Sequence, residues 1–244
     1  MELDPDLNLV AQLSSPRTLP ALFHGSNATR PARSEGLVIL DEPTPRLIEV
    51  LTHAFRLEPH NDWLFRDDGR RDPAFARYLN IYLSEIARRG ATFIMSTEMD
   101  AAAIVGRSVE ADHYLSIRAL IRIIPAVIHA CTPWRLHRMI AMEHALSRAH
   151  AGMKHLPHLV FMGGIEPRSQ STRRIGRYLK ERHPLLAAET ADPRVAALAC
   201  RRGAIETGRA RPLFGGPEMI FLLYRSSLRR HADVSTGHAF ERPA

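Results

Sequence analysis

The chain has 244 residues, 45% of them hydrophobic and 24% charged, which is ordinary for a globular protein with one substantial core. Its net charge is +7, and all but Lys154 and Lys180 of its 33 basic residues are arginines. Because the arginines are scattered rather than gathered on one face with interleaved aromatics, we expect a solvated surface rather than a nucleic-acid interface. The alternative is that the positive charge attracts an anionic ligand, which can be a phosphate-rich cofactor as well as a nucleic acid.

Neither the apolar segments nor the cysteines indicate a membrane or secreted protein. No run of about 18 uncharged apolar residues occurs, so we expect no membrane span. The first residues lack the basic and apolar regions of a secretory signal. Cys131 and Cys200 form no disulfide framework and match no metal-ligand spacing. We expect a cytoplasmic protein that is a monomer or homodimer, and no metal site.

Short apolar runs and helical periods alternate from residue 37 onward. Strands are predicted at residues 37–40, 91–96, 101–106, 158–165, 185–190, 204–208 and 218–225. Helices are predicted from Thr44, over 72–89, within 111–152, and over 173–182 and 193–202, with Pro125 and Pro133 breaking or kinking the third.

This alternation predicts an α/β (α+β) fold in which helices flank a mixed sheet. We expect a single domain over residues 37–225, with a helical insertion at about 111–152 before the central strand. Residues 1–36 and 226–244 have no sustained period, so they are predicted to be a flexible extension and a flexible tail.

One segment of the second half has the form of a phosphate-binding site. The strand at 158–165 ends in a polar loop, and a helix is predicted to begin near Arg173. Exposed N–H groups of such a loop and the positive end of the helix dipole converge on an anion.

This segment resembles the cofactor loop of the GNAT-superfamily N-acetyltransferases. That family carries Val-x-Pro-x-x-Gln-Gly-x-Gly-x-Gly between a strand and a helix, and residues 165–176 read IEPRSQSTRRIG. Relatives of puromycin N-acetyltransferase carry Leu-Glu-Thr-Ser-x-Pro-Arg-Asn, three residues, then Tyr-Glu-Arg-Leu-Gly-Phe. Residues 188–204, AETADPRVAALACRRGA, are similar to it without a gap. Residues 54–65 and the turn at Gly216 and Pro217 also fit, so the resemblance covers about residues 37–225.

The resemblance implies a mostly antiparallel central sheet and an acyl-CoA-dependent N-acetyltransferase. Acetyl-CoA would be the co-substrate, and a primary amine of a small-molecule acceptor would attack it directly. Candidates for catalysis are His158, Glu166 and Glu189, each of which has a structural alternative. The cofactor-binding residues that the resemblance implies are Met162, Gly163, Gly164, Ile165, Gln170, Ser171, Thr172, Arg173, Arg174, Ile175 and Gly176.

Three departures from the family pattern leave a second function open. Of the loop glycines only Gly176 remains, so Arg173 and Arg174 either bind phosphate directly or narrow the pocket. The helix after the loop is shorter by roughly two turns. Ala199 stands where the family often has a tyrosine that protonates the leaving thiolate, and Val195 stands at its usual asparagine. The alternative is therefore a catalytically degenerate domain that serves as a binding or regulatory module.

Two further groups of residues have both structural and functional interpretations. A helical spacing relates His137, His144 and His150, which we interpret as an exposed stripe rather than a metal site. We expect Trp63, Phe65 and Trp134 to be packed in the core. The alternative is that they line an aromatic pocket for the acceptor.

Overall fold

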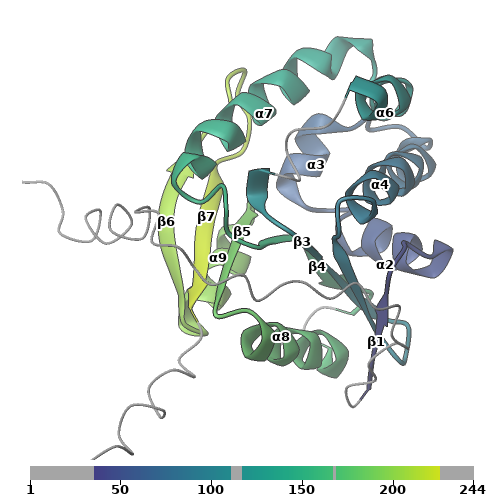
Figure 1. Cartoon of the computed structure of the whole chain (residues 1–244). Helices are drawn as coiled ribbons and strands as arrows, with labels where there is room; N and C mark the ends of the chain where they lie inside the picture. Colours follow the sequence, from purple (N-terminus) through teal and green to yellow (C-terminus); the bar gives the residue numbers. More distant parts are fainter. Residues whose placement is uncertain (1–35, 111–116, 167–168, 226–244) are drawn as a thin grey trace, which may run out of the picture.

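The computed structural model of the protein describes residues 36–110, 117–166 and 169–225, so the predicted extension and tail lie outside it. The described residues form a seven-stranded sheet in the order β1-β2-β3-β4-β5-β7-β6 (Figure 1). The strands are β1 (Leu37–Leu40), β2 (Thr92–Ser96), β3 (Ala101–Gly106), β4 (His158–Gly164), β5 (Leu185–Thr190), β6 (Ala204–Ala210) and β7 (Met219–Arg225). Every neighbouring pair is antiparallel except β4 and β5, which confirms the predicted mixed, mostly antiparallel sheet.

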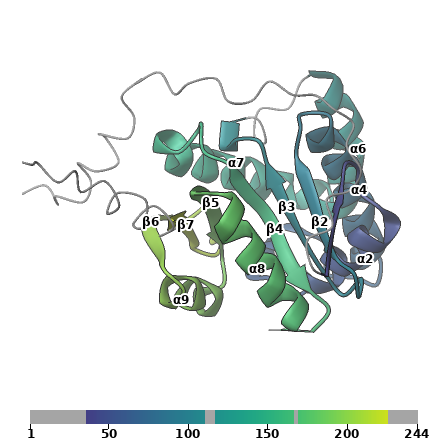
Figure 2. The same ribbon diagram turned by 60° about the horizontal axis from the view of Figure 1, so that its bottom comes forward.

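Helices cover both faces of the sheet (Figure 2). They are α2 (Pro45–Ala54), α3 (Pro59–Leu64), α4 (Arg71–Ala87), α6 (Ile117–Cys131), α7 (Leu136–Ala149), α8 (Gln170–Arg182) and α9 (Pro193–Arg201), with 3₁₀ turns at Pro133–Arg135 and His150–Gly152. One face carries α8 and α9, and the other carries α2, α4, α6 and α7. Within the described ranges, none of these helices is both long enough and apolar enough to cross a membrane.

Burial on both faces explains why the central strands are apolar along their whole length. In β3, Ala102 and Ile104 pack into the core shared with α2 and α4. Their neighbours Ala103 and Val105 point the other way and pack against Ile175 of α8. The sheet therefore separates two cores, and a side chain on β4 or β5 reaches one side or the other according to its position.

The sequence misplaced two features of the helices. α8 begins at Gln170, before the predicted start near Arg173, because the Ser169 hydroxyl caps it by accepting a hydrogen bond from the Thr172 N–H at 3.1 Å. Pro125 lies inside α6 instead of ending it. The carbonyl that a proline there leaves without its helical donor belongs to Ile121, whose side chain is 67% exposed, so water can hydrate that turn.

Candidate active site

The strands β4 and β5 pair only over a short stretch, at the start of β4 and the middle of β5. His158 lies opposite Ala187 and Leu159 opposite Ala188, and no later pair joins these two strands in the described residues. Because β4 continues to Gly164, the two strands diverge after this point, which we call the apex. A parallel pair that separates leaves backbone N–H and C=O groups facing the gap, where a ligand can bond them.

Three buried side chains meet at the apex. His158 is the first residue of β4, Glu189 lies on β5, and His150 begins the turn after α7. His158 Nε2 lies 2.8 Å from Oε2 of Glu189, and His150 Nε2 lies 3.4 Å from the same oxygen. The two histidine side chains are 2% exposed and the Glu189 side chain is 15% exposed, so the carboxylate is the most accessible member.

The Glu189 carboxylate is held in its charged form. Burial alone raises the pKa of this carboxyl. The charge of His158 and the hydrogen bonds from both histidines together outweigh burial, and they hold the pKa well below its usual range. Glu189 is therefore ionised at neutral pH.

A cavity of about 610 Å³ opens beside the apex, on the side of α4, α6 and α7. His158, Glu189 and Thr190 line it at the apex, and most of the remaining lining is aromatic or aliphatic. It has no lysine or arginine among the described residues that line it. In a chain with a net charge of +7, this makes the cavity an apolar site whose fixed charges are negative.

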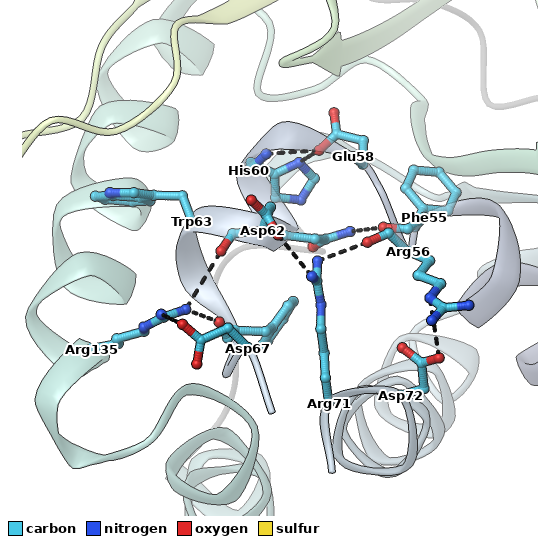
Figure 3. Close-up of polar contacts among 12 residues, drawn as sticks. Phe55, Arg56, Glu58, His60, Asp62, Trp63, Asp67, Arg71, Asp72 and Arg135 are labelled. Atoms are coloured by element: carbon cyan, nitrogen blue, oxygen red, sulfur yellow. Dashed lines mark hydrogen bonds and ion pairs between the residues drawn. The ribbon is translucent and has the colours of Figure 1, made fainter. Parts of the chain in front are cut away.

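Two further acidic residues, Glu58 and Glu143, line the same cavity. Glu58 caps α3, accepts a hydrogen bond from the Ala191 N–H at 3.0 Å, and forms an ion pair with His60 (Figure 3). Burial raises the pKa of this carboxyl, but the charge and hydrogen bond of His60 and the backbone N–H groups outweigh it, so the pKa is lowered. The bond fixes Glu58 near the end of β5, because Ala191 follows Glu189 closely in the sequence.

Ion pairs fix the segment that carries Glu58 against its neighbours. Arg71 of α4 bonds Asp62 of α3 at 2.7 Å, and Arg135 bonds Asp67 at 2.8 Å (Figure 3). Arg71 also donates to the carbonyl oxygen of Arg56 at 2.7 Å. Since α3 is only six residues long, these contacts, rather than its own helical bonds, hold it in place.

A basic groove of about 380 Å³ lies along α8, on the opposite face of the sheet. Its cationic lining residues are Arg173, Arg177, Lys180, Arg202 and Arg225, and no carboxylate lines it among the residues that the structure describes. β4 contributes Met162 to this groove and Phe161 to the cavity, since successive residues of a strand point to opposite faces. The diverging strands thus stand between a basic groove and an anionic, apolar cavity.

No family model and no curated protein matches this sequence. Among solved structures, one from Corynebacterium glutamicum ATCC 13032, described as histone acetyltransferase HPA2 and related acetyltransferase, is similar to 79% of this chain and 97% of its own, with a TM-score of 0.55 and 12% identity. The chain has the GNAT acetyltransferase fold. A polyamine N-acetyltransferase from Drosophila melanogaster has a TM-score of 0.45 and 12% identity, over 78% of this chain and 99% of its own. The ribosomal-protein-S18-alanine N-acetyltransferase from Escherichia coli has a TM-score of 0.39 and 12% identity, over 78% of this chain and 94% of its own.

Within this GNAT fold, the predicted cofactor residues fall into three environments. Met162, Arg173 and Gly176 line the basic groove. Interior positions belong to Ser171, whose hydroxyl bonds Asp100, and to the fully buried Ile175. Arg174 instead bonds Glu98 at 3.0 Å and the Gly36 carbonyl at 3.1 Å.

The rest of the loop of this GNAT fold is closely packed. A side chain at Gly163 would place its Cβ 2.6 Å from that of Ala54, and one at Gly164 would lie 2.9 Å from the Thr172 hydroxyl. Ile165 donates its N–H to the Asp100 carbonyl at 2.8 Å, and Gln170 is the first residue of α8. The two glycines therefore permit α2 and the start of α8 to approach β4 closely.

The catalytic candidates separate into two places. His158 and Glu189 are in direct contact at the apex, whereas Glu166 lies exposed beyond the other end of β4. Ala199 is 4% exposed and packs between α9 and the sheet, so that position contributes no proton donor. Cys200, beside it, is exposed.

The sequence interpretation of the histidine stripe was wrong for one member. His137 and His144 are exposed, but His150 is 1% exposed and reaches Glu189, because α7 ends there and the chain turns inward. Together with His158 these residues place three ligand atoms within 4.8 Å of one another, a donor set that suits Zn²⁺. The direct 2.8 Å bond between His158 and Glu189 already joins two of the three groups.

The aromatic candidates also have different positions. Phe65 lines the cavity and Trp63 packs against the core beside it. Trp134 is 84% exposed, which contradicts the expected burial, because it lies on the short 3₁₀ turn between α6 and α7.

Proposed function

We propose that the protein is an acetyl-CoA-dependent N-acetyltransferase that acts on a primary amine at the apex. The observation that carries this proposal is the position of the His158–Glu189 pair. It lies where β4 and β5 diverge, between a basic groove on one face and an anionic cavity on the other. The GNAT fold agrees with this assignment, and so does the sequence likeness to the puromycin N-acetyltransferase group.

Charge assigns the two substrates to the two sides. Acetyl-CoA carries several phosphate charges, which the guanidinium groups of Arg173, Arg177 and Arg202 would bind as charge-assisted donors. An amine is cationic in water, and the carboxylates of Glu58 and Glu189 would attract it into the cavity. The pantetheine arm would pass through the opening between the strands and bring the thioester to the apex.

The reaction needs a group that takes the proton of the amine. His158 would accept it as an imidazolium, and Glu189 would stabilise that cation, since its own low pKa keeps the proton off the carboxylate. The amine nitrogen would then attack the thioester carbonyl, forming the C–N bond of the amide. The C–S bond would break, and the thiolate would take up a proton, from His158 or from water, to leave as coenzyme A.

Backbone N–H groups of β4 beyond Leu159 would stabilise the oxyanion. They face the gap left by β5, and fixed amide dipoles are effective there because they need no reorganisation during the reaction. A proton returned from His158 to the thiolate also removes the need for a tyrosine at position 199. The degenerate interpretation therefore loses part of its motivation.

Calorimetric titration with acetyl-CoA tests the cofactor half of the proposal. We expect one site per chain, weakened about five- to tenfold by Arg202→Ala, because one charge-assisted contact to phosphate is lost. Arg201→Ala is the matched control, since the neighbouring Arg201 does not line the groove. Absence of binding at millimolar acetyl-CoA would refute the transferase. Binding without turnover of any amine would favour the binding-module alternative.

A further inference from the structure

We infer that the acceptor is an amphiphilic amine, with an ammonium group on an aromatic or alkyl body. This inference rests on the proposed function and deepens it by naming the substrate class. It follows from the lining of the 610 Å³ cavity, which combines carboxylates with a large aromatic and aliphatic surface.

The fixed charge of the cavity lining is negative. Three acidic residues, Glu58, Glu143 and Glu189, line the cavity, and the pKa values of Glu58 and Glu189 are lowered, so those two are carboxylates at neutral pH. Their partners within the protein are histidines, and no lysine or arginine side chain is among the described residues that line the cavity. A cationic ligand lowers the free energy of such a site, whereas an anionic ligand would be repelled.

Aromatic rings form one wall of the cavity. Ring contacts run without interruption from β4 to α4: Phe161 lies 6.4 Å from Tyr82, Tyr82 lies 5.8 Å from Tyr78, and Tyr78 lies 5.5 Å from Phe65. Phe55 joins the same wall 5.0 Å from Phe161. This surface suits an aromatic or alkyl group.

The opposite wall is aliphatic and extends to the surface. Ile124 and Ile128 of α6 and Ile140 of α7 line the cavity, yet they are 48%, 39% and 71% exposed. An apolar body longer than the cavity would therefore continue to cover hydrophobic side chains as it leaves the mouth. This geometry favours an amine whose remote end is apolar.

Binding of matched ligands to the wild-type chain, without acetyl-CoA, tests the inference directly. We expect phenylbutylamine to bind at least tenfold more tightly than phenylbutanol, which has the same body without the charge, and than diaminobutane, which has no apolar end. Hexylamine, heptylamine and octylamine should gain about fourfold in affinity per methylene. Equal affinity for the amine and the alcohol, or tighter binding of diaminobutane, would overturn the inference.

A variant locates the amine within the cavity. Glu58→Gln should weaken phenylbutylamine at least tenfold and leave phenylbutanol unchanged, while Glu206→Gln, at an exposed carboxylate on β6, should change neither. Equal loss for amine and alcohol would contradict the charge argument. If Glu58→Gln fails to fold, the wild-type ligand series still decides.

Failure of this inference is distinguishable from failure of the proposed function. Acetyl-CoA binding with no preference for amphiphilic amines would overturn the acceptor class alone. Binding of amphiphilic amines without binding of acetyl-CoA would support the cavity assignment and refute the transferase.

Discussion

The substitution Glu189→Gln tests the apex most sharply, because it removes one charge and keeps nearly the same shape. Two histidine nitrogens lie 2.8 and 3.4 Å from one oxygen of this carboxylate, and the protein buries all three groups. The low pKa of Glu189 means that these contacts outweigh the cost of burying its charge.

The expected magnitudes follow from those two bonds. A hydrogen bond to a charged group contributes about 1.5–3 kcal/mol and a neutral one about 0.5–1.5 kcal/mol. Replacing both charged bonds by neutral ones should therefore cost about 2 kcal/mol, or roughly 4–8 °C in the midpoint of thermal unfolding. The amine acetylation rate should fall about 10²–10⁴-fold, because His158 loses the group that stabilises its protonated form.

The assay is steady-state acetylation together with thermal unfolding and acetyl-CoA titration. We expect kcat to fall while the Kd for acetyl-CoA stays within about twofold, since Glu189 lies on the cavity side of the sheet. Glu206→Gln, which alters an exposed ion pair with Arg209, should leave all three unchanged. A Glu189→Gln variant with wild-type turnover would refute the assignment of the base.

Three further predictions concern stability and reactivity. The pKa of Glu189 is lower in the folded chain than its ordinary value of 4.5. Its contribution to stability is therefore present above pH 4.5 and is lost as the pH falls through the lowered pKa. Thermal unfolding midpoints measured from pH 6 to about pH 3 should decline less in Glu189→Gln than in the wild type. Burial raises the pKa of Cys131 to about 12. A thiol reagent should therefore modify Cys200 alone in the native chain and both cysteines in denaturant. Rapid modification of both cysteines in the native chain would contradict the fold. Gly163→Ala should destabilise the fold by about 1–3 kcal/mol, because the new Cβ would lie 2.6 Å from a side chain of α2. In Gly176→Ala the new Cβ would meet only one atom, at 3.9 Å, so thermal unfolding should show a neutral or slightly stabilising effect.

Local signals made most of the fold predictable from the sequence. The Thr44 side chain accepts a hydrogen bond from the Leu47 N–H at 3.2 Å, as its position before Pro45 predicts. Short apolar runs and helical periods located the seven strands and most helices, since burial on one or both faces dictates those patterns. The helix α3 was missed because six residues carry too little periodicity, and ion pairs from distant segments hold it.

The site was less predictable because it depends on long-range packing. His158 and Glu189 were found through likeness to family positions, but their 2.8 Å contact depends on the register of β4 and β5. His150 has no local signal, since only the turn after α7 points it inward. Glu58 carries the signal of a helix cap before a proline, and nothing in that signal says that the cap faces a cavity.

Mass-spectrometric detection of the acetylated amine tests the central claim most directly. The purified chain is incubated with acetyl-CoA and phenylbutylamine, and the amide and free coenzyme A are quantified together, with Cys200→Ser used where thiols are measured. We expect equal amounts of amide and coenzyme A, dependent on both substrates and strongly reduced in Glu189→Gln. Release of coenzyme A without amide, or no product from any amphiphilic amine at saturating acetyl-CoA, would contradict it.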